Sequence, residues 1–269
     1  MDQQLYEDQF SESHNFLEST AAIKTLVIAS TPRSGSHFLG HALHKTGHFG
    51  FPLEYANPKN LKKWEEVLGV KGIQNVLEKL QSIRTSPNGV FAIKSHYTHL
   101  QGFGGLREFT KLVNNPYFVL LTRQDILKQA ISLSIARQTG VWISGQQAKS
   151  DALKYDEADI TYCLKRTILH NASWKYLLAS SNVKYMEVSF EEAKTNLANT
   201  VRTVANFMEM DIPEKNVPTT PATKKQSNSV NEEWEDRFRR SKHSEMLLDL
   251  DLALGHKSKK RQLKELLFN

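Results

Sequence analysis

The feature that most constrains this chain is a short apolar run that leads through a small-residue loop into a helix. Residues 25–30 are mostly apolar or β-branched and too few for a helix, which predicts a buried strand. A loop over 31–35 and a helical pattern over 36–46 follow directly. Gly47 is typical of the position just past a helix end. This strand–loop–helix unit predicts an α/β protein with a parallel sheet.

Strands and helices alternate along the rest of the chain. Strands are predicted over 90–93, 117–121 and 183–190, and helices over 70–84, after Asp125, over 157–179, over 191–208 and after Ser229. The alternation predicts a three-layer αβα architecture around a central parallel sheet. Ligands of such sheets bind at the carboxyl ends of the strands. We expect one domain over 1–269, with a polar lead-in at 1–23 and a basic tail at 242–269.

Composition narrows the class of protein. The chain carries 35 Lys and Arg against 29 Asp and Glu, a net charge of +6 that suits an anionic ligand. The basic residues are not interleaved with aromatic side chains, so we expect no nucleic-acid partner. The single cysteine, Cys163, excludes an internal disulfide framework. No apolar run is long enough to span a membrane, and the acidic start is unlike a secretion signal, so we expect a cytoplasmic protein.

The loop between the first strand and the first helix is a candidate phosphate site. Backbone N–H groups at the start of a helix point toward one spot, and the helix dipole adds positive potential there. Gly35 permits a close approach, Arg33 adds charge, and Ser34 and Ser36 add hydroxyl donors, with His37 next in line. An ordinary strand–turn–helix connection is the alternative.

The same loop does not fit an ATP–magnesium site. The pattern GxxxxGK[ST] is absent, and the strand at 117–121 ends in Thr122-Arg123, without a carboxylate for magnesium. His41 and His44 share a helix face but have no acidic or cysteine partner nearby, so no metal site is expected. A P-loop kinase-like phosphotransferase nevertheless remains the alternative enzyme class.

Several motifs occur together in a specific order. They are the loop 31–36, Thr46-Gly47, 52–55, 87–90 with Lys94, Arg123-x-Asp125, Gln129-Ala130-x-Ser132, 138–142, and Glu233-Trp234 with Arg237. In this order the chain resembles the Stf0-type, trehalose 2-sulfotransferase-like bacterial enzymes over about residues 24–240. The resemblance implies a P-loop-like sulfotransferase that uses 3′-phosphoadenosine 5′-phosphosulfate (PAPS) without a metal and releases 3′,5′-bisphosphoadenosine.

The resemblance also implies roles for individual residues toward the donor. The 5′-phosphosulfate would contact the loop residues Arg33, Ser34, Gly35, Ser36 and His37, where His37 replaces the threonine common in the family. Arg123 and Ser132 match the pair that holds the 3′-phosphate. Lys225 and Gln226 match a loop that closes over the nucleotide.

Sulfuryl transfer needs a base for the acceptor hydroxyl and a cation for the leaving oxygen. Glu54 matches the family's proposed base, whereas Lys94-Ser95-His96 resembles the Lys-Thr-His of eukaryotic cytosolic sulfotransferases, in which the histidine is the base. Both candidates stay open, and Lys94 is expected to stabilise the leaving phosphate. The acceptor is expected to be a hydroxyl of a carbohydrate or glycolipid. The sequence leaves open a homodimer and a peripheral membrane contact through the basic tail.

Overall fold

The fold is built on four parallel strands, seen in a computed structural model that describes residues 6–143, 146–148, 153–220 and 229–241. The strands are β1 (Lys24–Ser30), β2 (Val90–His96), β3 (Pro116–Thr122) and β4 (Lys184–Ser189). They lie in the order β2-β1-β3-β4, and every neighbouring pair is parallel. The predicted parallel sheet is therefore confirmed.

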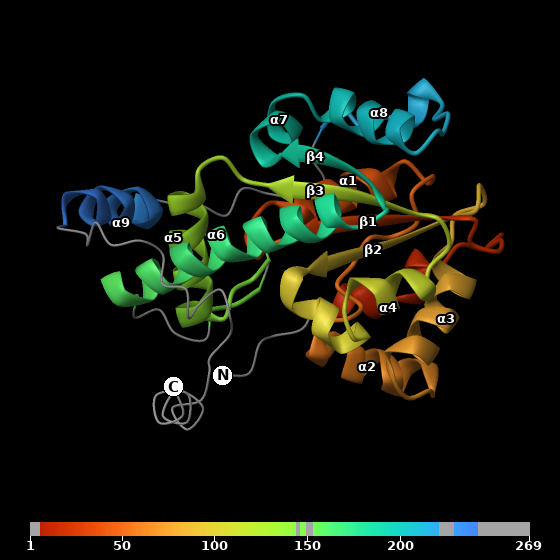
Figure 1. The fold of residues 1–269 in the computed structure, drawn as a ribbon, viewed down its shortest axis with the longest axis horizontal. Coiled ribbons are helices and arrows are strands. Elements are labelled where there is room, and N and C mark those ends of the chain that lie inside the picture. Colours follow the sequence, from red (N-terminus) through yellow and green to blue (C-terminus); the bar gives the residue numbers. More distant parts are fainter. Residues whose placement is uncertain (1–5, 144–145, 149–152, 221–228, 242–269) are drawn as a thin grey trace, which may run out of the picture.

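Helices cover both faces of the sheet, which gives the predicted three layers (Figure 1). One face is covered by α1 (Ser36–Lys45), α7 (Phe190–Thr195) and α8 (Leu197–Phe207). The other is covered by α2 (Pro58–Leu68), α3 (Ile73–Arg84), α4 (Leu106–Lys111) and α6 (Glu157–Ser180). Past the carboxyl ends of the strands lie α5 (Ile126–Thr139) and α9 (Ser229–Arg240).

The strand pleat divides the core between the two faces. Leu26 and Ile28 of β1 pack toward α1 and α8, whereas Val27 and Ala29 pack toward the opposite helices. All four are completely buried, as a central parallel strand with two covered faces requires. This burial explains why the run at 25–30 reads as continuously apolar. No helix among the described residues is long and apolar enough to cross a membrane.

Some element boundaries differ from the sequence expectations. The second strand does not stop at residue 93 but continues to His96, so Lys94 and His96 belong to the sheet. The helix expected over 191–208 is two helices, because the Asn196 side chain accepts a hydrogen bond from Asn199 N and starts α8 afresh. Helix α2 was not predicted, although Asn57 as the N-cap and Pro58 at its first position are typical start signals.

Part of the expected lead-in is packed onto the domain. Residues Glu7–Phe10 and Glu12–His14 form two short 3₁₀ turns. The Phe10 ring lies 4.9 Å from the ring of Trp64 in α2, and Phe16 N donates to Ile83 O of α3 at 3.0 Å. This segment therefore packs against α2 and α3.

Candidate active site

A cleft of about 1240 Å³ lies at the carboxyl ends of β1, β2 and β3. Its position agrees with the expectation for a parallel sheet, because the loops that leave these strands converge there. Most of the site residues expected from the sequence line it: Arg33, Gly35, Ser36, His37, Glu54, Lys94, His96, Arg123 and Ser132. Segments far apart in the sequence thus meet in one cavity.

The loop after β1 has an unusual backbone. Arg33 has a φ of 65° and Gly35 a φ of 90°, both in the left-handed region. A side chain at Gly35 would also collide with Phe190, because an added Cβ would lie 2.1 Å from Phe190 Cδ2. Only glycine satisfies both conditions. The loop can therefore turn sharply into α1 with its backbone facing the cleft.

Helix α5 and helix α6 brace this loop from behind. The buried Gln129 side chain donates to Thr31 Oγ1 at 2.9 Å and to Pro32 O at 2.7 Å. Thr31 in turn donates to Asn171 Oδ1 of α6 at 3.1 Å. The sequence singled out Gln129 only as part of a motif, and its bracing function depends on contacts that no local pattern contains. Buried hydrogen bonds of this kind hold the loop in one conformation.

Two arginines face the cleft beside the loop. Arg33 Nε donates to Ser132 Oγ at 2.9 Å, and its guanidinium also donates to Trp142 O. Arg123 lies 3.8 Å from a carboxylate oxygen of Glu191 and 5.5 Å from the Phe190 ring centroid. Burial, and then the charge of Arg123, lowers the pKa of Arg33 to about 10, so Arg33 stays charged at neutral pH. The predicted pair Arg123 and Ser132 is thus brought to the same cleft as Arg33.

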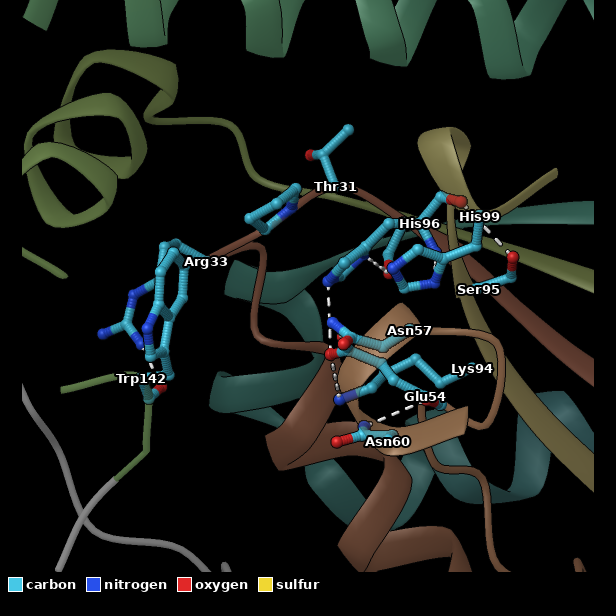
Figure 2. A network of polar contacts seen from close by, with 12 residues as sticks. Thr31, Arg33, Glu54, Asn57, Asn60, Lys94, Ser95, His96, His99 and Trp142 are labelled. Atoms are coloured by element: carbon cyan, nitrogen blue, oxygen red, sulfur yellow. Dashed lines mark hydrogen bonds and ion pairs between the residues drawn. The ribbon is translucent and has the colours of Figure 1, made fainter. Parts of the chain in front are cut away.

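Glu54 is held against the end of β2 (Figure 2). The segment at Leu53 runs beside β2, where Lys94 N donates to Leu53 O at 2.9 Å. Because side chains alternate along a strand, Lys94 and His96 point to the same face. Lys94 Nζ lies 3.0 Å and His96 Nε2 lies 3.2 Å from the same oxygen, Glu54 Oε1. The two candidate bases are therefore neighbours.

The two carboxylate oxygens of Glu54 differ in their surroundings. Oε1 meets both Lys94 and His96, whereas Oε2 accepts only a long hydrogen bond, 3.4 Å, from Asn57 Nδ2 among the described residues. Burial alone would raise the pKa of Glu54, but the charges of His96 and Lys94 outweigh it and hold the pKa well below its usual range. Glu54 is ionised at neutral pH, and its Oε2 is the less occupied oxygen.

The neighbouring histidines are neutral. Burial, with the charge of Lys94 second, lowers the pKa of His37 to about 2. Burial, with His96 second, lowers the pKa of His99 to about 3, and His99 Nδ1 accepts from His96 N at 3.2 Å. His37 and His99 therefore add no positive charge near Glu54 at neutral pH.

The remaining expected residues are placed as follows. Ser34 is completely buried, does not line the cleft, and its Oγ has no hydrogen-bond partner among the described residues. Lys225 and Gln226 lie outside the described residues. Among the described residues, no group of three or more His, Cys, Asp or Glu side chains could hold a metal ion. His44 instead stacks on Phe51, with ring centroids 3.9 Å apart.

Comparison with known protein families identifies the chain at this point. The Stf0 sulphotransferase model matches residues 90–241, more than half of the sequence. The chain belongs to the Stf0 sulphotransferase family. It is therefore an enzyme of the sulfotransferase type. The matched part contains Lys94, His96, Arg123 and Ser132, whereas the loop after β1 and Glu54 precede it.

Individual relatives agree with this family. The chain is 24% identical over 257 residues to trehalose 2-sulfotransferase of Mycobacterium tuberculosis, with 81% of this chain and 95% of the relative covered. It is also 24% identical over 254 residues to trehalose 2-sulfotransferase of Mycolicibacterium smegmatis, with 80% and 94% covered. Among solved structures, the sulfotransferase domain of the Synechococcus PCC 7002 olefin synthase aligns with a TM-score of 0.51 at 14% identity, covering 93% of this chain and 96% of that chain. This likeness shows the fold.

Proposed function

We propose that this Stf0 sulphotransferase moves the sulfuryl group of PAPS to a hydroxyl of a carbohydrate or glycolipid. The observation that carries the proposal is one cleft with two differently charged ends. The loop after β1 and the arginines Arg33 and Arg123 form a cationic end. The ionised Glu54, with Lys94 and His96 on one oxygen, forms the other.

The cationic end fits a nucleotide with two phosphate-type groups. The strand–loop–helix turn directs backbone N–H groups toward the cleft, which suits the 5′-phosphosulfate. Arg123, with Ser132 nearby, suits the 3′-phosphate, because an arginine can bind a phosphate through two parallel hydrogen bonds. Lys94 comes from β2, lines the same cleft as the loop after β1, and its Nζ lies 3.0 Å from Glu54 Oε1. In this proposal Lys94 contacts the leaving phosphate oxygen.

The transfer step assigns the proton to Glu54. The acceptor hydroxyl donates to Glu54 Oε2, its oxygen attacks sulfur in line, and the bond from sulfur to the phosphate oxygen breaks. The hydroxyl proton ends on Glu54, and the charge that grows on the leaving oxygen is offset by Lys94. When Lys94 contacts that oxygen, Glu54 loses part of the positive charge that makes it a weak base. Donor binding thus strengthens the base.

His96 is better suited to support Glu54 than to act as the base. Its Nε2 faces the carboxylate, and its Nδ1 lies 3.1 Å from Ser30 Oγ. With the proton on Nε2 directed at Glu54, Nδ1 accepts from the Ser30 hydroxyl. Both ring nitrogens then have partners, so a hydroxyl proton reaches His96 only by way of Glu54.

The acceptor class rests on two supports. Two similar proteins are trehalose 2-sulfotransferases, which indicates a sugar hydroxyl as the acceptor. The cleft near Glu54 is lined by uncharged polar side chains such as Asn57, Asn60 and Gln101. Amides of this kind can both donate to and accept from hydroxyl groups.

The donor assignment is tested by binding. Thermal shift and calorimetry with 3′,5′-bisphosphoadenosine, with ATP and magnesium, and with RNA should show stabilisation by the first alone. Stabilisation by ATP and magnesium alone would instead favour a kinase-like enzyme. Incubation with radiolabelled PAPS and a glycan extract, followed by mass spectrometry, then identifies the sulfated acceptor.

We also propose a cytoplasmic setting, because Cys163 is the sole cysteine and lies buried as a free thiol. Light scattering would show whether the chain forms a homodimer. A peripheral membrane contact would involve the tail at 242–269, which lies outside the described residues.

A further inference from the structure

The N-terminal segment over residues 6–15 forms part of the cleft wall. Tyr6 and Gln9 line the cleft, although both precede the first strand. The Tyr6 ring meets the ring of His37 edge-on at 5.3 Å, and Gln9 is only 2% exposed. The family match begins at residue 90, so it assigns no function to this segment. The structure therefore adds a wall that the shared motifs do not contain.

A buried arginine holds this segment in place. Arg84, at the end of α3, is completely buried and donates to the carbonyls of Gln9 at 3.1 Å and Ser11 at 3.0 Å. It also donates to Asn15 Oδ1 at 2.7 Å. A buried guanidinium is costly unless its donors are satisfied, and the partners of Nε and Nη2 all come from this segment, whereas Nη1 has no partner among the described residues. These bonds therefore hold the backbone of the segment against α3. Gln9 is thereby held in one position relative to the cleft.

A chain of amides links Gln9 to the segment that carries Glu54. Gln9 Nε2 donates to Asn60 Oδ1 at 3.2 Å. Asn60 Nδ2 in turn donates to the backbone carbonyl of Glu54 at 3.0 Å (Figure 2). Asn57 approaches the other side of Glu54, with its Nδ2 3.4 Å from Oε2. Asn57 thus contacts the less occupied oxygen of the carboxylate, while Asn60 and Gln9 hold the backbone beside it.

The two residues of the segment that line the cleft, Tyr6 and Gln9, are uncharged. Asp8 accepts from the Tyr6 hydroxyl at 2.7 Å and pairs with His14 at 2.9 Å, so its charge is engaged within the segment. A wall of amides and one aromatic ring suits a polyhydroxylated, uncharged ligand. It does not attract the anionic donor, which the two arginines bind at the other end.

We propose that the segment over residues 6–15 is the acceptor-binding wall of this enzyme, and that Gln9 and Asn60 orient a sugar so that one hydroxyl faces Glu54 Oε2. The inference rests on the proposed sulfuryl transfer and adds the residues that select the acceptor. Gln9 and Asn60 are positioning residues, because they act on the sugar and on the backbone of Glu54 rather than on the transferred group.

The test compares sugar kinetics with donor binding in matched variants. Gln9→Ala, Asn60→Ala and the double variant are assayed with PAPS and a panel of trehalose, maltose, glucose and octyl glucoside. Gln74→Ala, at an exposed position on α3, is the control. Each single variant should raise the KM for the sugar that serves as acceptor about tenfold, which is the loss of affinity expected for one hydrogen-bonding group. The kcat should change by less than about twofold. The double variant should raise the KM by less than the product of the two single increases, because Gln9 and Asn60 act as a pair.

Donor binding separates this inference from the proposed function. The Kd for 3′,5′-bisphosphoadenosine should be the same in all four variants and in the unmodified chain. Loss of that binding in the unmodified chain would refute the proposed function itself. With donor binding intact, an unchanged sugar KM in Gln9→Ala would overturn the assignment of residues 6–15 as the acceptor-binding wall. Sulfation of no sugar in the panel would overturn it as well. Sulfation of octyl glucoside alone would support the wall and indicate a lipid-linked sugar.

Discussion

The two ends of the cleft solve opposite electrostatic problems. At the donor end, Arg33 and Arg123 lie close enough for the charge of one to lower the pKa of the other. At the base end, Glu54 meets Lys94 and His96 on one oxygen, and the nearby His37 and His99 are neutral. Positive charge is thus accumulated where the proposed donor would bind, and it is paired with a carboxylate where the proposed acceptor hydroxyl would react. One cavity can therefore bind a highly charged donor and still keep a carboxylate ready as a base.

The largest effect is expected when the carboxylate of Glu54, the proposed base, is removed. Glu54→Gln should lower kcat by about 10²- to 10⁴-fold, the usual contribution of a general base, while the Kd for 3′,5′-bisphosphoadenosine changes little. Single-turnover assays with PAPS and calorimetry measure the two quantities. An inactive His96→Ala beside an active Glu54→Gln would reverse the assignment of the base.

Removing one cation at a time sharpens the contrast at the donor end. Arg123→Ala should weaken binding of 3′,5′-bisphosphoadenosine by about 10- to 100-fold, the loss of charge-assisted hydrogen bonds. Binding of adenosine 5′-phosphate, which lacks the 3′-phosphate, should change by less than about threefold. Arg33→Ala should weaken both nucleotides. Equal weakening of both by Arg123→Ala would contradict its function toward the 3′-phosphate.

The loop after β1 packs closely against Phe190 at Gly35. Gly35→Ala forces a side chain into the left-handed region and against Phe190, which lies 2.1 Å from the added Cβ. We expect a loss of about 1–3 kcal/mol in the free energy of unfolding and weaker nucleotide binding. Chemical denaturation and calorimetry measure both. Gly47→Ala, where an added Cβ meets no atom within 4 Å, is the control for backbone strain alone.

A smaller effect is expected in the pH dependence of the transfer rate, which tests the assignment of Glu54 as the base. The pKa of Glu54 is held low, so the transfer rate should stay flat between about pH 5 and 7, whereas a free imidazole base titrates near 6.5. If kcat/KM instead falls tenfold for each pH unit as the pH is lowered through that range, the base is a histidine.

Stability should depend on pH in the same range for a separate reason. Burial lowers the pKa of His41 and of His44 to about 4. Between the unfolded value near 6.5 and about 4, the unfolded chain binds more protons, so stability decreases as the pH falls through this window. Thermal denaturation at several pH values should show this decrease, and His41→Phe should make it shallower. An unchanged slope in His41→Phe would contradict the low pKa.

The loop after β1 and its place in the cleft were predictable because their signals are local. The strand at 25–30, the loop with Gly35 and the helix after it are consecutive, and periodicity and turn chemistry reveal them. The ordered motifs around Arg123 and Ser132 extend the same signal. The assignment of Ser34 as a direct contact stays a prediction, because a sequence pattern does not show which loop side chains turn inward.

The base end was predictable only as a set of alternatives. The sequence named Glu54, Lys94 and His96 as candidates, yet their meeting on one carboxylate oxygen depends on β2 continuing to His96 and on Leu53 running beside it. The N-terminal wall was not predicted at all. Its polar composition resembles a solvated lead-in, because the partner that holds it, Arg84, lies far along the chain.

The sequence by itself determined the order of strands and helices, the glycine turn after the first strand and the family to which the chain belongs, since these depend on neighbouring residues. Only the tertiary structure decided which oxygen of Glu54 has fewer partners, which buried histidines have a lowered pKa and that the N-terminal segment lines the cleft. Those properties arise from burial and from charges that meet through space, and a linear pattern carries neither.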